Sequence, residues 1–221
     1  MTELQNRLIQ IRRELPPEVH LVAVSKFQPV SALQEAYDAG QRIFGESRVQ
    51  ELQQKHEILP TDIEWHFIGH LQANKVKYIA PYISLIHAVD SVKLLTEIDR
   101  QAQKNNRVIS CLFQIHIAQE ETKYGFSIEE FRDFLEKGAW RGMSNVRFCG
   151  IMCMATFTDD REQIRKEFRT ARDLFEETRE RYFKESKDFS QCSWGMTDDY
   201  PIAIEEGSNL VRIGTKIFGS R

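Results

Sequence analysis

The chain has 221 residues, of which 41% are hydrophobic and 29% charged, and its formal net charge is −3. These values are ordinary for a soluble globular protein, and the slight negative charge argues against a nucleic-acid-binding protein that depends on bulk positive charge. No apolar stretch approaches the roughly 20 residues of a membrane-spanning helix, and the charged N-terminus lacks the apolar segment of a signal peptide. We therefore expect a cytoplasmic protein with neither a membrane nor a nucleic-acid partner.

Short apolar segments alternate with longer amphipathic ones along the whole chain. A charged amphipathic helix is predicted first, over residues 1–15. The predicted strands follow at 19–25, 42–45, 63–68, 83–89, 108–117, 146–154, 190–194 and 209–213. The predicted helices between them cover 30–39, 48–59, 74–79, 92–104, 128–140, 161–184 and 200–206.

Eight strands, each joined to the next by a helix, predict a parallel sheet. Eight such units favour a closed (β/α)8 barrel, because right-handed crossovers bring the last strand beside the first. An open doubly wound sheet is the alternative, but it usually has a glycine-rich turn after an early strand, and SKFQPVS (25–31) has no glycine. No linker divides the chain. We expect an α/β fold with a single TIM-barrel domain over residues 1–221 and an extra N-terminal helix.

No metal site is expected. Each of the four cysteines lies in or beside an apolar stretch, as expected for buried reduced thiols: Cys111, Cys149, Cys153 and Cys192. Cys149 and Cys153 do not have the CxxC spacing of a zinc site. His66 and His70 fall on one face of a predicted strand, but no carboxylate or third histidine accompanies them in the sequence.

In such a barrel the active site lies at the carboxyl ends of the strands. The residues predicted there are Lys26, Glu46, His70, Asp90, His116, Met154 and the runs 193–197 and 212–215. Glu46 and Asp90 can serve as acid or base, although salt bridges at the barrel rim are the expected role, and His70 is expected to form hydrogen bonds at the mouth. Ser25 should point away from Lys26, toward a helix.

Two of these runs predict a phosphate site. SWGMTDD (193–199) follows the seventh predicted strand, and LVRIGTKIFG (210–219) contains the eighth. Each has a glycine, a hydroxyl and the unpaired N–H groups of a helix start, and barrels often bind phosphate at these two loops. Strand alternation directs Arg212 into the barrel, where it needs an anion or another hydrogen-bonding partner. Ordinary turn glycines and a structural ion pair of Arg212 are the alternatives.

Lys26 would lie beside this phosphate site, because strand eight neighbours strand one in a closed barrel. A lysine in that place can neutralise the phosphate, or its free amine can form a Schiff base with the carbonyl of a phosphorylated ligand. A lysine that only extends from the strand end into solvent is the other possibility.

Nine segments, in order over most of the chain, point to one family. They are AVSK (23–26), FGESRVQE (44–51), WHFIGHLQANKVKYI (65–79), IHAVDS (86–91), ETKYGF (121–126), GIMCMA (150–155), GMTDD (195–199), AIEEG (203–207) and VRIGTKIFG (211–219). As a set they closely resemble the pyridoxal phosphate homeostasis protein family, the YggS or PROSC-like proteins.

The resemblance implies a barrel of the alanine racemase N-terminal type, like that of fold-type III PLP proteins, with pyridoxal 5′-phosphate (PLP) as an aldimine on Lys26. It also implies phosphate contacts from 193–197 and 212–215 and places Arg212 near the pyridine nitrogen. Topology and resemblance together predict these cofactor-binding residues: Lys26, His70, Ser193, Met196, Thr197, Arg212, Gly214 and Thr215. Neither a catalytic residue nor a metal ligand is expected.

Two positions depart from the family pattern. Ser47 stands where an asparagine is expected, and the fifth predicted strand ends in QIHIAQEE, with His116 in place of an asparagine-containing segment. The resemblance therefore assigns no contact to the 3-hydroxyl side of the ring. Other lysines can bind the aldehyde transiently, and the candidates are Lys75, Lys77, Lys123 and Lys216.

The resemblance favours a non-enzymatic protein that holds and supplies PLP inside the cell. PLP-dependent apoenzymes are candidate recipients, and effects on amino-acid and keto-acid balance would be indirect.

The alternatives are a racemase-like PLP enzyme and a class I aldolase with a phosphorylated substrate. A racemase of this fold type needs an acid–base group from an added domain, whereas the sequence ends at Arg221. An arginine at the pyridine nitrogen also weakens the ring as an electron sink. We expect a monomer, because no apolar surface helix is evident.

Overall fold

The computed structural model describes residues 1–120 and 124–219. Eight strands run through these residues: β1 (His20–Val24), β2 (Ile43–Glu46), β3 (Glu64–Phe67), β4 (Leu85–Val89), β5 (Ile109–Gln114), β6 (Val146–Met152), β7 (Gln191–Ser193) and β8 (Leu210–Ile213). All pair in parallel, in the order β7-β6-β5-β4-β3-β2-β1-β8. The prediction of eight parallel strands is confirmed.

The sheet curls into a nearly closed barrel. β8 pairs with β1, so that Leu210 lies opposite His20 and Ile213 opposite Ala23. Within the described chain β7 and β8 form no ladder, but several hydrogen bonds cross the gap. Asn209 exchanges two of them with Cys192, and the Arg212 N–H donates to the Gly195 oxygen at 3.0 Å. The predicted neighbourhood of strands eight and one is therefore confirmed.

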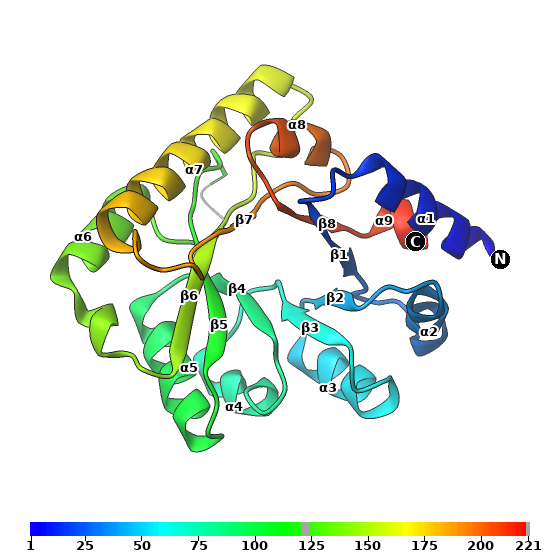
Figure 1. Cartoon of the computed structure of the whole chain (residues 1–221), viewed down its shortest axis with the longest axis horizontal. Coiled ribbons are helices and arrows are strands. Elements are labelled where there is room, and N and C mark those ends of the chain that lie inside the picture. Colours follow the sequence, from blue (N-terminus) through cyan, green and yellow to red (C-terminus); the bar gives the residue numbers. More distant parts are fainter. Residues whose placement is uncertain (121–123, 220–221) are drawn as a thin grey trace.

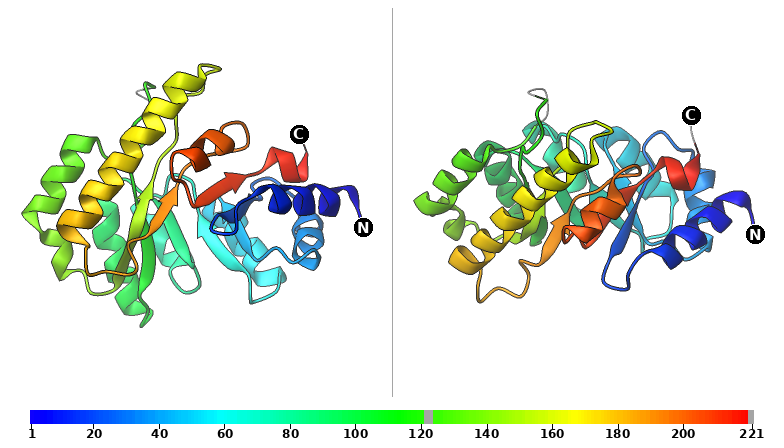
Figure 2. Two further views of the ribbon diagram at one scale, coloured as in Figure 1. Left: turned by 45° about the horizontal axis from the view of Figure 1, so that its top comes forward. Right: turned by 90° about the horizontal axis from the view of Figure 1, so that it is seen from above.

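Helices surround the barrel (Figures 1 and 2). They are α1 (Glu3–Glu14), α2 (Val30–Asp38), α3 (Val49–Ile58), α4 (Val76–Ile79), α5 (Val92–Lys104), α6 (Ile128–Lys137), α7 (Arg161–Tyr182), α8 (Tyr200–Glu205) and α9 (Thr215–Phe218), with 3-10 turns η1 (Ala73–Lys75) and η2 (Ala139–Gly142). The first and last helices pack together, since Arg7 on α1 donates to the Ile217 oxygen on α9 at 2.8 Å. None of the helices in residues 1–120 and 124–219 has the length and apolar character to cross a membrane.

Polar caps set where several helices begin. Thr2 and Ser127 each form a capping box, at the starts of α1 and α6. Asp160 accepts hydrogen bonds from two N–H groups at the start of α7, and Ser91 accepts one at the start of α5. These side chains satisfy N–H groups that have no partner within the helix. The helix predicted over 128–140 ends early, because Gly138 takes a left-handed conformation (φ 69°) that ends α6 and leads into η2.

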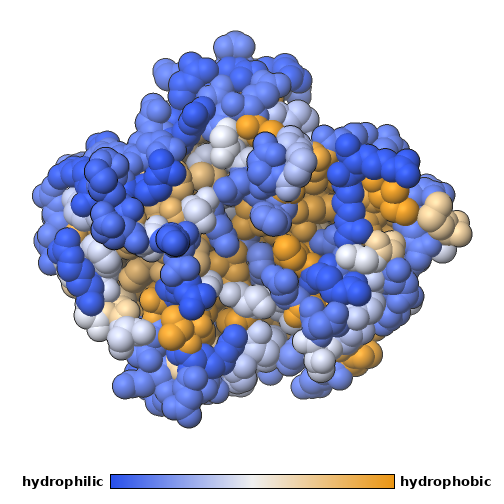
Figure 3. Space-filling view, in the orientation of Figure 1, coloured by the Kyte–Doolittle hydropathy of each residue, from blue (hydrophilic) through white to orange (hydrophobic). Residues whose placement is uncertain are grey.

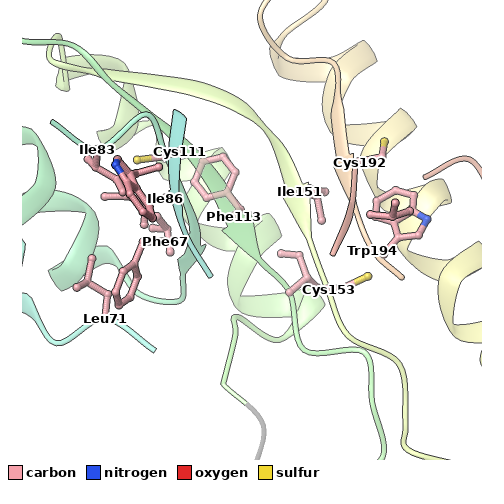
Figure 4. Close-up of a cluster of buried hydrophobic side chains, with 14 of the residues drawn as sticks. Phe67, Leu71, Ile83, Ile86, Cys111, Phe113, Ile151, Cys153, Cys192 and Trp194 are labelled. Carbon is pink, nitrogen blue, oxygen red and sulfur yellow. The ribbon is translucent and has the colours of Figure 1, made fainter. Parts of the chain in front are cut away.

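Apolar side chains fill two layers. The larger lies between the strands and the helices, and Figure 4 shows part of it, with contributions from Phe67, Ile86, Phe113, Ile151 and Cys192. The smaller lies inside the barrel and contains Val22, Leu85, Ala88, Leu112, Cys149, Met152 and Leu210. Strands buried on both faces are apolar almost throughout, which explains the short apolar runs in the sequence. All four cysteines are free and buried, as predicted.

The outer surface is mostly hydrophilic. In Figure 3 hydrophilic residues form most of the perimeter, and hydrophobic residues gather toward the middle of this face. Some of the outward-facing charged residues of α7 form ion pairs, such as Arg181 with Glu177 and Arg165 with Glu205. These ion pairs lie on the solvated face of this long helix.

Candidate functional site

A cavity of about 530 Å³ opens at the carboxyl ends of the strands. Its lining residues are Val24, Lys26, Gln28, Ser47, Ile68, Met154, Phe157, Met196, Thr197, Asp198, Arg212, Gly214, Thr215 and Gly219. Six of the eight predicted site residues are among them: Lys26, Met196, Thr197, Arg212, Gly214 and Thr215. The structure therefore brings together predicted residues that follow the first and the last strand of the barrel, such as Lys26 and Thr215.

Lys26 enters this cavity from a tight turn directly after β1. The residue before it, Ser25, is fully buried, and its hydroxyl donates to Glu46 Oε1 at 2.6 Å. The residue after it, Phe27, has a left-handed backbone (φ 65°), which is rare for a side chain of this size. The predicted opposite directions of Ser25 and Lys26 are confirmed, because the Ser25 hydroxyl binds the Glu46 oxygen that Lys55 of α3 also contacts, whereas Lys26 lines the cavity.

Glu46 lies behind the site and does not line the cavity. It accepts a hydrogen bond at 2.6 Å from the ammonium of Lys55 on α3, and both side chains are buried. Burial raises the pKa of the Glu46 carboxyl, and the attraction of Lys55 opposes that rise. The expected role of Glu46 in a structural salt bridge is confirmed.

Arg212 on β8 has a side chain directed into the barrel, as predicted, and is 3% exposed. It donates to the Ser193 oxygen at 2.7 Å, the Ser193 hydroxyl at 2.6 Å and the Cys153 oxygen at 2.9 Å. These acceptors are uncharged, so the hydrogen bonds fix the guanidinium without neutralising it. Burial lowers the pKa of Arg212. A buried cation of this kind favours an anionic group in the adjoining cavity.

Ser193 does not line the cavity. Its hydroxyl joins Arg212 to His87 Nδ1 at 2.9 Å, and His87 Nε2 meets His66 Nδ1 at 3.0 Å. Both histidines are buried inside the barrel, and burial lowers the pKa of each, that of His66 to about 3. The Ser193 side chain thus lies behind the cavity wall, between Arg212 and His87. Sequence analysis missed His87, although its alternation with the apolar neighbours of β4 was the available signal.

The two predicted phosphate-binding runs lie side by side. Thr197 Oγ1 accepts hydrogen bonds from the Gly214 N–H at 3.3 Å and from Thr215 Oγ1 at 3.2 Å. Asp199 closes the turn before them by accepting the Met196 N–H at 2.5 Å. Thr197, Gly214 and Thr215 therefore form one wall of the cavity, close to the starts of α8 and α9.

Other strand-end residues lie outside the cavity lining. His70 binds Asp90 Oδ2 at 2.8 Å and stacks on Tyr124, with ring centroids 3.8 Å apart. That bond supports the expected rim role of Asp90, and the expected contact of His70 with a ligand stays a prediction. His116 bonds to the Glu120 oxygen at 2.9 Å. Lys123 and the first residues of the ETKYGF segment, 121–123, lie outside the described residues.

Among the residues that the structure describes, those with a charge that line the cavity are Lys26, Arg212 and Asp198, so cations outnumber anions in this lining. Apolar side chains, Ile68 and Met154 among them, line another part of the wall. Sequence analysis did not anticipate this apolar part beyond Met154. The arrangement can hold a small molecule with an anionic group and an apolar body, and Lys26 presents an amine nucleophile to it.

The whole sequence matches a known family. The family model described as "Alanine racemase, N-terminal domain" matches residues 1–221. The pyridoxal phosphate homeostasis protein of Aquifex aeolicus (strain VF5) is 39% identical over 202 residues, which cover 91% of this chain and 86% of that protein. The one of Escherichia coli (strain K12) is 34% identical and covers 100% and 98%. The chain belongs to the pyridoxal phosphate homeostasis protein family.

Solved structures share the fold. PipY of Synechococcus elongatus PCC7942 without PLP is 34% identical and superposes with a TM-score of 0.91 over 98% of this chain and 100% of that chain. PipY with PLP bound is 33% identical, with a TM-score of 0.88 over the same shares. An alanine racemase of Clostridium difficile 630, 15% identical, shows the same barrel with a TM-score of 0.73 over 99% of this chain and 56% of that chain. The predicted fold class is confirmed.

Proposed function

We propose that this protein binds PLP in the cavity at the carboxyl ends of the strands and holds it covalently through Lys26. The observation that carries this proposal is that Lys26 shares one cavity with Arg212 and with the wall that contains Thr197 and Thr215. The family's name and the PLP-bound PipY structure support it. We also propose that residues 1–221 act as one PLP-binding domain, since the family match spans all of them.

The residues present fit PLP. The dianionic phosphate suits the wall formed by Thr197, Gly214 and Thr215, where hydroxyl and main-chain N–H groups meet. The aromatic ring suits the apolar side chains of Ile68 and Met154. Arg212, a donor without an acceptor atom, suits the ring nitrogen only as an unprotonated acceptor. A cavity of about 530 Å³ has the size of a typical small-molecule site.

Bound PLP supplies an aldehyde that condenses with a primary amine, forming a C=N bond with loss of one water molecule. Lys26 supplies the amine, because it is the lysine that lines this cavity among residues 1–120 and 124–219. The threonine wall orients the phosphate, and Arg212 holds an orientation set by three hydrogen bonds. The arrangement anchors the cofactor at two ends.

The role that these features support is storage and supply of PLP. Relatives named for PLP homeostasis favour a carrier over an enzyme. We propose PLP-dependent apoenzymes as recipients, a monomeric state and a cytoplasmic location. Four free, buried cysteines support a reducing compartment.

The test is an absorption spectrum of the purified protein with added PLP, before and after borohydride reduction, for the wild type and Lys26→Ala. We expect a long-wavelength band in the wild type that disappears on reduction, and pyridoxyl-labelled Lys26 in the digested protein. Lys184→Ala, which alters an exposed lysine paired with Glu180, is the matched control and should behave as the wild type. Equal labelling in Lys26→Ala would contradict the assignment, and sustained amino-acid racemisation would contradict the carrier role.

A further inference from the structure

Four buried or half-buried polar residues lie behind Lys26, and the PLP site does not use them directly. We call Ser25, Glu46, Glu51 and Lys55 the Lys55 cluster. Lys55 comes from α3, and its side chain is only 4% exposed. Its ammonium donates to Glu46 Oε1 at 2.6 Å, the Ser25 main-chain oxygen at 2.7 Å and Glu51 Oε1 at 2.7 Å. An ammonium has three hydrogens, so each has an acceptor.

The Lys55 cluster contacts the chain on both sides of Lys26. On one side, Lys55 binds the Ser25 carbonyl, and Glu46 accepts the Ser25 hydroxyl. On the other side, Glu51 accepts the Phe27 N–H, and the same carboxylate oxygen accepts from Lys55. The turn is thus bound before and after Lys26 by groups that are bonded to one another.

The conformation of this turn needs support. Phe27 has φ 65°, in the left-handed region that a residue with a Cβ rarely adopts. Such a residue persists where the surrounding structure determines its conformation. The hydrogen bond from the Phe27 N–H to Glu51 is a contact that does so. Without it the turn can relax to a negative φ, which would redirect the Lys26 side chain.

We propose that Glu51 and Lys55 are positioning residues for Lys26, holding the Ser25–Phe27 turn in the conformation that directs the Lys26 amine into the cavity. This inference rests on the proposed function. Neither residue lines the cavity, so both act through the turn. Their effect should therefore fall on covalent binding through Lys26 and spare the contacts with phosphate and ring.

Pyridoxine 5′-phosphate separates these two effects, because it has the ring and phosphate of PLP but an alcohol in place of the aldehyde. The primary variant is Glu51→Ala, since Glu51 is partly exposed and its loss leaves Lys55 bound to Glu46 and Ser25. We expect the dissociation constant for covalently held PLP to rise about tenfold or more. We expect the dissociation constant for pyridoxine 5′-phosphate to stay within about twofold. Glu57→Ala, an exposed position on the same helix, is the matched control.

A second-site change tests the conformational cause. Glycine adopts a positive φ without a steric penalty, so Phe27→Gly should restore most covalent PLP binding to Glu51→Ala. Lys55→Met should likewise raise the dissociation constant for PLP and leave that for pyridoxine 5′-phosphate nearly unchanged. Thermal unfolding shows whether each variant is folded.

Wild-type PLP affinity in Glu51→Ala would overturn the inference. So would a parallel loss of both ligands that Phe27→Gly does not restore. Failure of the wild type itself to label Lys26 would instead overturn the proposed function.

Discussion

One guanidinium nitrogen of Arg212 donates to both oxygens of Ser193, the main-chain one at 2.7 Å and the hydroxyl at 2.6 Å. Because the hydroxyl accepts from a cation, its own hydrogen is left to donate to His87 Nδ1. His87 then donates from Nε2 to His66 Nδ1. The hydrogen bonds therefore all run in one direction, from the cavity into the barrel, and they tie the cation of the site to two neutral histidines.

Ser193→Ala should destabilise the protein by about 1–3 kcal/mol, because it leaves a buried nitrogen of His87 without its partner and removes one acceptor of Arg212. Arg212 keeps the main-chain oxygens of residues 193 and 153, so the cavity should persist. Urea denaturation measures the loss. Ser190→Ala, at an exposed position before β7, is the control and should be nearly neutral. Equal stability of the two variants would show that the hydroxyl bridge contributes little.

Acidification should destabilise the protein through His66. Burial lowers the pKa of His66 to about 3, whereas a histidine in the unfolded chain has a pKa of about 6.5. Between these values the unfolded state binds more protons. The free energy of unfolding therefore falls as the pH drops, by up to about 1.4 kcal/mol per pH unit for one histidine. The stability contributed by the neutral ring is present above about pH 6.5 and is lost toward pH 3.

The variant His66→Asn isolates this effect, because the asparagine oxygen can replace Nδ1 as acceptor for His87 and does not titrate. Urea denaturation gives the free energy of unfolding at about pH 7.5 and at about pH 5. The decrease in this free energy between the two pH values should be about 2 kcal/mol larger in the wild type than in the variant. Other titrating groups, including Glu46, are common to both proteins and largely cancel in the comparison. An identical pH dependence would mean that His66 is not kept neutral by burial.

Gly195→Ala should be strongly destabilising. Gly195 has φ 90°, and a Cβ there would lie 2.6 Å from the Cβ of Ala203 and 2.9 Å from the Cα of Tyr200. We expect a loss of about 2 kcal/mol or more, from the left-handed strain and the overlap with α8. The turn that carries Thr197 should shift as well, so binding of pyridoxine 5′-phosphate should weaken. Gly142→Ala, where a Cβ would meet no atom within 4 Å, is the matched control. Comparable melting temperatures would contradict this account.

The fold could be predicted from the sequence because parallel strands covered on both faces are apolar along their whole length. β4 is buried at every position, and it appears in the sequence as the run ISLIHAV. Most errors were at element ends. The helix predicted over 128–140 runs past its true end because only the left-handed conformation of Gly138 marks the stop.

The site was predictable where it depends on strand ends alone, which is why Lys26 and Arg212 could be assigned. Contacts that depend on register were not. His66 and His87 meet because β3 and β4 pair with His66 opposite Leu85, and no spacing in the sequence states that register. The burial of Lys55 could not be predicted either, because a lysine on a charged helix is expected to be exposed. Only the packing of this helix against β2 brings Lys55 to Glu46. Ser193 was predicted to bind the cofactor, and the structure places it at the end of β7 but not in the cavity lining.

Thr197→Val should lower the affinity for phosphorylated ligands selectively. The Thr197 hydroxyl accepts from the Gly214 N–H and from Thr215, so it organises the wall assigned to the phosphate. Valine keeps the shape of the side chain and removes the hydroxyl. We expect the dissociation constant for pyridoxine 5′-phosphate to rise about tenfold to a hundredfold, the size of one lost hydrogen bond to a charged group. Weak binding of pyridoxal, which has no phosphate, should change little, and Thr170→Val on α7 should affect neither ligand. An equal fall in affinity for both ligands would place the phosphate elsewhere in the cavity.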